Sequence, residues 1–128
     1  MSYNLHFEIY PDYIFFKRSG VADYNEIVAS WSQVSRTCKE HGIKKVLAQT
    51  VNEIYLSTTE MYEIASGFRA LGFESGFKVA HVFIGTEPES EGRFGETVAL
   101  NRGANYRVFD DLESAKAWLL GKKGDVLK

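Results

Sequence analysis

Three stretches near the end of the chain decide the fold: RFGETVALNRG (93–103), YRVF (106–109) and DDLESAKAWLL (110–120). The first predicts a helix that ends at Gly103, because glycine readily adopts the left-handed conformation that stops a helix. The second predicts a short strand. The third predicts a helix capped by Asp110, with Glu113 completing a capping box. Helix, strand and helix in this order form the closing unit of a layered α/β protein.

The beginning of the chain predicts a β-hairpin. Apolar Leu5, Phe7 and Ile9 alternate with polar residues, which is the pattern of a half-buried strand. A Pro-Asp turn pair at 11–12 separates this strand from a second, aromatic-rich strand at 13–18. The short connection makes the pair antiparallel and leaves the first strand at an edge of the sheet.

The next segment predicts an amphipathic helix. Asp23 and Glu26 have the spacing of a capping box, in which each side chain accepts a hydrogen bond from a backbone N–H of the first turn. Gly42 is expected to end the helix. The apolar stripe that should face the sheet consists of Ile27, Trp31, Val34 and Cys38.

A second capping box, Ser57 with Glu60, predicts another helix that runs to Gly72. Gly67 falls inside this helix, where it is expected to allow a close approach to the sheet. The apolar runs at 45–50 and 77–84 predict strands that are covered on both faces, as in a parallel sheet.

The predicted order is therefore ββαβαβαβα. It describes a mixed five-stranded sheet with a leading antiparallel hairpin followed by parallel βα units, joined by right-handed crossovers. The pattern leaves open whether the helices cover one face or both. Residues 1–121 are expected to form a single domain, and 122–128 a loosely ordered tail.

Composition excludes several classes of protein. The chain has 128 residues, 45% of them hydrophobic, and a formal net charge of −2. Dedicated nucleic-acid binders usually carry a strongly basic stripe, so nucleic acid is not an expected partner. One cysteine, no signal-peptide pattern and no apolar run of ~18 residues predict a cytoplasmic protein without a membrane span.

The leading hairpin and the final Asp-capped Trp-Leu helix resemble the SpoIIAA-like group of the STAS superfamily. The resemblance is carried by residues 96–120 and by the GVADY segment at 20–24. It implies a right-handed superhelix of βα units and a non-enzymatic role in the bacterial cytoplasm. That role would be regulatory binding of protein partners, sometimes controlled by phosphorylation. Some related folds bind small or lipid ligands instead.

The chain departs from the phosphorylated members at the start of the second helix. Those proteins carry an Asp-Ser-Ser-Gly-type sequence, whereas this chain reads NEIYLSTTE at 52–60. Ser57, Thr58 and Thr59 supply hydroxyls, but the Asp and the Gly are missing. We expect this helix start to belong to a binding face without being phosphorylated.

Ligands of α/β sheets lie at the carboxyl ends of parallel strands. Three loops, at 19–23, 50–59 and 85–93, should meet there, although solvated capping loops would account for the same residues. Several glutamates in these loops would repel a phosphate. The candidate ligand-binding or partner-binding residues are Asn52, Tyr55, Ser57, Thr58, Thr59, Glu87 and Arg93.

Aromatic residues concentrate in the hairpin, which only Glu8, Lys17 and Arg18 guard with charge. Exposed edge strands pair readily with another chain, so we expect a homodimer through Tyr3 to Phe16. The leading interpretation is a non-catalytic STAS-like regulatory or protein-interaction module. The alternative is a small-molecule or lipid carrier. Its pocket, between helices and sheet, would be lined by Trp31, Phe68 and Phe94, together with Trp118.

An enzyme is the third interpretation, since no positioned acid–base pair or nucleophile is evident. His81 lies in the most apolar strand and is expected to be buried with a hydrogen-bonded ring. Cys38 is expected to be a buried, inert thiol. The three histidines lack the spacing of a zinc site, so no metal or cofactor is predicted.

Overall fold

The computed structural model describes residues 3–20, 23–51, 58–67, 69–73, 76–84 and 105–121, and the structural statements below concern these residues. The strands are β1 (Tyr3–Ile9), β2 (Ile14–Gly20), β3 (Lys45–Val51), β4 (Lys78–Ile84) and β5 (Tyr106–Phe109). The helices are α1 (Tyr24–His41), α2 (Thr58–Ser66), the 3-10 helix η1 (Arg69–Leu71) and α4 (Leu112–Leu120). The helix predicted at 93–103 and the tail predicted at 122–128 lie outside the described residues.

The five strands form one sheet in the order β1-β2-β3-β4-β5. Strand β1 pairs antiparallel with β2, and Phe7 lies opposite Phe16. Strands β2 to β5 run parallel to one another. The predicted mixed sheet, with a leading hairpin and an antiparallel edge strand, is confirmed.

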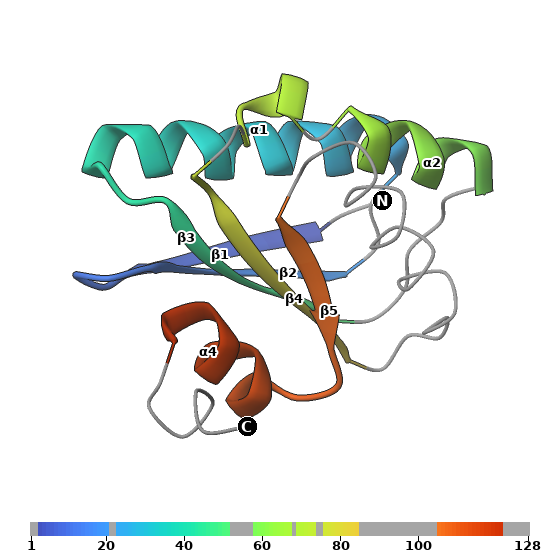
Figure 1. Cartoon of the computed structure of the whole chain (residues 1–128). Coiled ribbons are helices and arrows are strands. Elements are labelled where there is room, and N and C mark those ends of the chain that lie inside the picture. The colour runs from blue at the N-terminus through green and yellow to red at the C-terminus, as the bar shows by residue number, and fades with distance from the viewer. Residues whose placement is uncertain are drawn as a thin grey trace.

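Helices cover both faces of the sheet, which answers the question that the sequence left open. Helices α1 and α2 lie on one face and α4 lies on the other (Figure 1). The larger apolar cluster, between α1 and the sheet, includes Phe16, Trp31 and Val34. The smaller cluster, between α4 and the sheet, includes Leu47, Val82 and Leu119. Alternate residues of each central strand therefore point into different clusters, as period-two alternation requires.

Helix α1 follows its sequence signals closely. Asp23 accepts a hydrogen bond from the Glu26 N–H, and the Glu26 side chain accepts one from the Asp23 N–H, both at 2.9 Å. The predicted stripe is buried, with Val34 and Cys38 fully inaccessible to solvent. Gly42 ends the helix in the left-handed conformation. The capping box, the buried face and the stop are confirmed.

The cap of α4 differs from the prediction by one residue. Asp111, not Asp110, accepts the hydrogen bond of the first turn, from the Ser114 N–H at 2.7 Å. The Ser114 hydroxyl also donates to Asp111, at 3.3 Å. These two bonds, the backbone one first, lower the pKa of the Asp111 carboxyl. Because α4 begins at Leu112, the third helical residue is Ser114 and the predicted capping box with Glu113 does not form.

The second helix is shorter than predicted. Helix α2 ends at Ser66, one residue before Gly67, and the chain continues into η1. A Cβ added at Gly67 would meet only the Glu63 carbonyl oxygen, so this glycine marks no close approach to the sheet. The close approach lies at Gly72, where an added Cβ would collide with Oγ of Ser35 in α1. The capping residue predicted for this helix, Ser57, lies outside the described residues.

Candidate functional site

The two sheet faces are covered to different extents. Helix α4 packs against β3, β4 and β5. The α4-side face of the hairpin carries His6 and Glu8, which are exposed, whereas Leu5 and Phe7 on the other face are partly buried against the larger cluster. In the described part of the chain, the α4-side face of the sheet is therefore exposed to solvent at the hairpin.

A groove of about 370 Å³ lies between the hairpin and α4. Its aromatic side is built by Tyr10 and Tyr13, whose rings stack with centroids 4.8 Å apart. Lys116 of α4 places its ammonium 5.6 Å from the centre of the Tyr13 ring. The residues lining the groove are Glu8, Tyr10, Tyr13, Phe15, Leu47, Leu112, Glu113 and Lys116. The groove combines an aromatic wall with charges of both signs.

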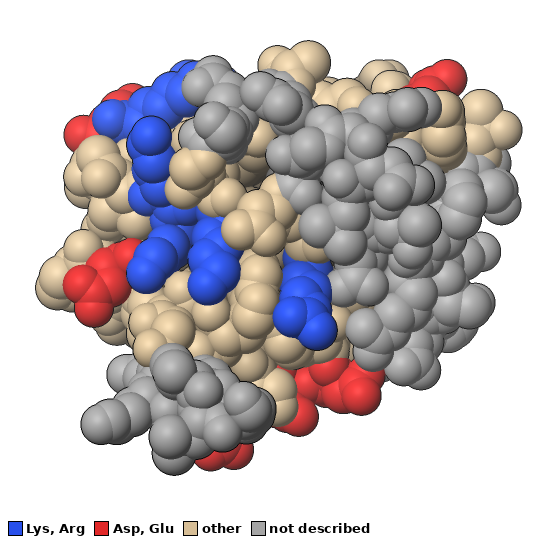
Figure 2. Space-filling view, viewed as in Figure 1, with Lys and Arg blue, Asp and Glu red and all other residues tan. Residues whose placement is uncertain are grey.

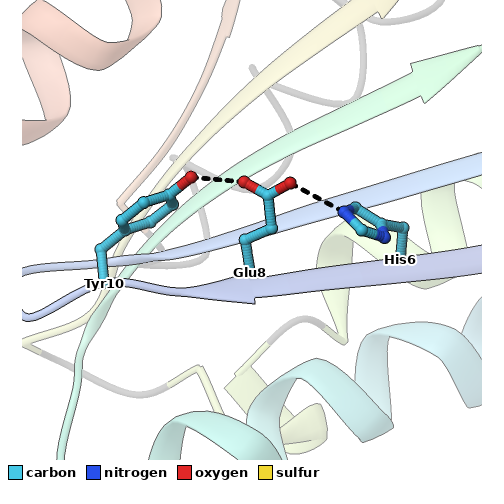
Figure 3. A network of polar contacts seen from close by, with 3 residues as sticks. All are labelled: His6, Glu8 and Tyr10. Carbon is cyan, nitrogen blue, oxygen red and sulfur yellow. Dashed lines mark hydrogen bonds and ion pairs between the residues drawn. The ribbon is translucent and has the colours of Figure 1, made fainter.

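Three polar residues form a network along the outer face of β1 (Figure 3). Nε2 of His6 lies 2.8 Å from Oε2 of Glu8, and the Tyr10 hydroxyl donates to the other oxygen of the same carboxylate. The Tyr10 bond, followed by the His6 bond, lowers the pKa of Glu8. The Glu8 bond raises the pKa of Tyr10. The network holds an ionised carboxylate between an imidazole and a phenol on an exposed strand.

Strand β1 lies at the end of the sheet, and no described strand pairs with its outer edge. The Tyr10 N–H donates to the Tyr13 carbonyl across the turn, at 2.9 Å. Backbone groups alternate in direction along an antiparallel strand. The N–H and C=O groups of Leu5, Phe7 and Ile9 therefore point away from β2, toward the open edge. Among the described residues, Ile9 is also the most exposed large apolar side chain, at 48%.

A chain of buried polar side chains crosses the sheet beneath α1. Arg18 donates to the Ser30 hydroxyl at 2.9 Å and to Oγ1 of Thr50 at 3.4 Å. Oγ1 of Thr50 lies 2.8 Å from Nε2 of His81. Nδ1 of His81 lies 2.6 Å from the Tyr106 hydroxyl. These five side chains link β2, α1, β3, β4 and β5.

The electrostatics of this chain are set by burial. Burial, and then the nearby Arg18 charge, lowers the pKa of His81 well below its ordinary value, so the ring is neutral. Burial lowers the pKa of Arg18 to about 10, which leaves it a cation at neutral pH. The prediction of a buried, hydrogen-bonded His81 is confirmed. The prediction that Arg18 guards the edge is wrong, because Arg18 is only 4% exposed.

Sequence reasoning did not identify Arg18, Thr50 or Tyr106 as a group. One signal was available: Arg18 shares its alternation with Ile14 and Phe16, which places it on the buried face of β2. Cys38 behaves as predicted, since it is fully buried and burial raises the pKa of its thiol to about 12.

Positive charge gathers between α1 and α4 on the face shown in Figure 2. The Lys78 ammonium lies 4.4 Å from the centre of the Trp118 ring, and the Arg107 guanidinium lies 5.9 Å from it. Lys78 also donates to the Trp118 carbonyl at 2.7 Å. These cations cover an indole at the rim of the smaller cluster, so packing accounts for their positions.

Most of the predicted site residues lie outside the described part of the chain: Asn52, Tyr55, Ser57, Glu87 and Arg93. Thr58 is the first residue of α2, and Thr59 is exposed in its first turn. Whether these residues meet at one site stays a prediction.

The predicted carrier pocket needs one correction. Trp31 belongs to the cluster under α1, whereas Trp118 packs against the cluster under α4. The sheet separates the two indoles, so one pocket cannot contact both. Phe68 and Phe94, the other predicted lining residues, lie outside the described residues.

Comparison with known proteins finds likenesses among solved structures only. No family model matches the chain, and no curated protein matches it. An uncharacterised protein of the DUF3478 family from Shewanella loihica PV-4, described as having a SpoIIAA-like fold, is 19% identical. The match covers 91% of this chain and 93% of that one, with a TM-score of 0.47.

None of the described helices is both long and apolar enough to cross a membrane. No group of three or more His, Cys, Asp or Glu side chains suited to a metal ion occurs among these residues.

Proposed function

We propose that this protein is a non-catalytic interaction module that works as a pair of identical copies joined along β1. One observation carries the proposal: the open edge of β1 is complementary to itself. Within 3–9 the edge strand contains neither lysine nor proline, two of the residues that natural sheets use to block edge pairing, and its one charged residue is Glu8.

The backbone supplies the first part of the complementarity. The outward N–H and C=O groups of Leu5, Phe7 and Ile9 can pair with the same groups of a second, antiparallel copy. Two-fold symmetry makes such an interface self-complementary, with each contact present twice. A two-fold axis at Phe7 pairs residues 5–9 of the two copies and extends the sheet across both.

The side chains favour this register over its two neighbours. An axis at His6 would pair all of 3–9, but it would place Glu8 opposite Asn4 and the two imidazoles opposite each other. An axis at Phe7 places His6 opposite Glu8 of the second copy, and Leu5 opposite Ile9. An axis at Glu8 would bring two carboxylates together, and cross-strand like charges are destabilising. The exposed Ile9 would be covered by the second copy, which removes an apolar side chain from water.

Sedimentation equilibrium tests the proposal over a protein concentration range of about 5 to 500 µM. Wild type should approach the mass of a dimer. Ile9→Lys should stay a monomer, because it places a charge in the interface. The matched control is Ile84→Lys, at a residue of β4 that is exposed to 40%, and it should dimerise like wild type. A monomeric wild type, or equal association by the two variants, would refute the proposal.

The pairing of His6 with Glu8 of the second copy can be tested separately. His6→Glu should weaken the dimer, because it places a second carboxylate opposite Glu8 of the other copy, whereas His6→Lys should strengthen it. Equal dimer constants for these two variants would exclude the two-fold axis at Phe7.

The apolar-ligand carrier stays the alternative prediction. Among its predicted lining residues, Trp31 is 3% exposed and packs edge-on against Phe73 and His81. A change of tryptophan fluorescence that saturates with decanoate, and that Trp31→Phe removes, would favour the carrier.

A further inference from the structure

Arg18 is a buried cation in the middle of the fold. It lies on β2 at a position that points toward α1, as Ile14 and Phe16 do, and it is 4% exposed. Transfer of a charge from water to a protein interior costs several kcal/mol unless an opposite charge compensates it. Guanidinium groups keep their proton in proteins, so Arg18 does not avoid this cost by becoming neutral.

The described residues around Arg18 do not supply a negative charge. Its hydrogen bonds go to two hydroxyls, those of Ser30 and Thr50. The Ser30 hydroxyl donates to the Ile27 carbonyl at 2.7 Å, so its oxygen is oriented to accept from Arg18. The ion pair of His6 with Glu8 lies on the opposite face of the sheet. The hydroxyls orient the guanidinium without neutralising it.

The position of Arg18 also favours a ligand. It lies near the carboxyl end of β2, and its partner Thr50 is the penultimate residue of β3. Ligands of parallel sheets bind at this end of the strands. A guanidinium has five donors in a planar fork that matches the two oxygens of a carboxylate or a phosphate. Two hydroxyl partners leave donors of Arg18 for such a group.

We propose that Arg18, oriented by Ser30 and Thr50, binds a small oxyanion, a carboxylate or phosphate group, under the amino-terminal half of α1. The neutral His81 and the Tyr106 hydroxyl hold Thr50 in place through the buried hydrogen-bond chain. This site is distinct from the β1 edge, although Arg18 lies opposite Leu5, because the edge groups point away from β2 whereas the Arg18 side chain points toward α1.

Thermal unfolding of the full chain with sodium phosphate and with sodium acetate tests this site, with ionic strength held constant by sodium chloride. An anion that binds only the folded protein should raise Tm by about 5 °C at ten times its Kd. Arg18→Met should abolish this rise. Arg107→Met is the matched control, because it removes an exposed arginine and the same charge, and it should keep the rise. Arg18→Lys, which lacks the fork, should raise Kd about tenfold or more.

A measurement on the wild type avoids any loss of folding in the variants. The side-chain N–H resonance of Arg18 should shift and saturate with phosphate or acetate, while that of Arg107 should not. Saturation by one anion only identifies which oxyanion the site takes. The proposal is overturned if neither anion shifts the Arg18 resonance, or if Arg18→Met responds as Arg107→Met does. Self-association can be measured separately, so its failure would leave this result standing.

Discussion

Replacement of Gly72 by alanine tests the contact between η1 and α1. Gly72 has φ of +116°, a conformation that residues with a side chain rarely adopt, and a Cβ there would collide with Oγ of Ser35. Ser35 is a buried residue of α1, at 3% exposed, and cannot easily turn away. Alanine therefore introduces both backbone strain and steric overlap.

The two effects give a large loss of stability. A non-glycine residue held in a sparsely populated backbone region costs about 1–3 kcal/mol. Overpacking of a buried contact costs about 1–3 kcal/mol more. We therefore expect Gly72→Ala to lower the free energy of unfolding by about 4 kcal/mol, out of about 5–15 kcal/mol for an ordinary domain.

Urea denaturation followed by tryptophan fluorescence measures this loss, since Trp31 contacts Phe73 next to the mutated site. The matched control is Gly42→Ala. Gly42 has φ of +68° and nothing within 4 Å of an added Cβ, so only backbone strain of about 1–2 kcal/mol should appear. Adding Ser35→Ala to Gly72→Ala should recover part of the excess. If the two glycine variants lose the same stability, within about 0.5 kcal/mol, the steric argument is wrong.

Two further predictions concern the cap of α4 and the buried imidazole. In urea melts, Asp111→Ala should lower the free energy of unfolding more than Asp110→Ala does. In the wild type, the stability that Asp111 contributes should be lost as pH falls through the lowered pKa of its carboxyl. Because the folded pKa of His81 lies well below its ordinary value, the unfolded chain binds the extra proton below about pH 6.5. The free energy of unfolding should then fall with decreasing pH by up to about 1.4 kcal/mol per pH unit, and His81→Asn should remove this pH dependence. If the variant and the wild type show the same dependence on pH, His81 is not its source.

The sequence predicts a helix well where its apolar repeat and its capping residues mark the same segment. Helix α1 has both, since Asp23 and Gly42 bound a stripe that recurs with the helical period. The start of α4 shows where such signals fail, because the capping-box spacing favours Asp110 with Glu113, whereas Asp111 caps the helix. Which aspartate caps the helix depends on where α4 meets the sheet, and spacing cannot decide that.

The candidate sites depend on the tertiary arrangement more than the individual helices and strands do. Composition predicts Arg18 as an edge charge of the hairpin, whereas its alternation with Ile14 and Phe16 places it inside. The groove beside Tyr10 could not be predicted, since it exists only because α4 covers β3 to β5 and stops short of the hairpin. Sequence patterns locate a residue on a face, but they do not say how far a helix extends over that face.

The strand order has a consequence for how the chain can fold. Each described strand pairs with the strand before it in the sequence, so none is inserted between two strands that are already paired. The sheet can grow in one direction from the hairpin, one βα unit at a time, while the chain emerges during synthesis. Every step closes a loop between sequence neighbours, which keeps the entropy cost of each closure low. Termination after any of these strands would leave a shorter sheet in the same order, rather than a sheet with a missing centre.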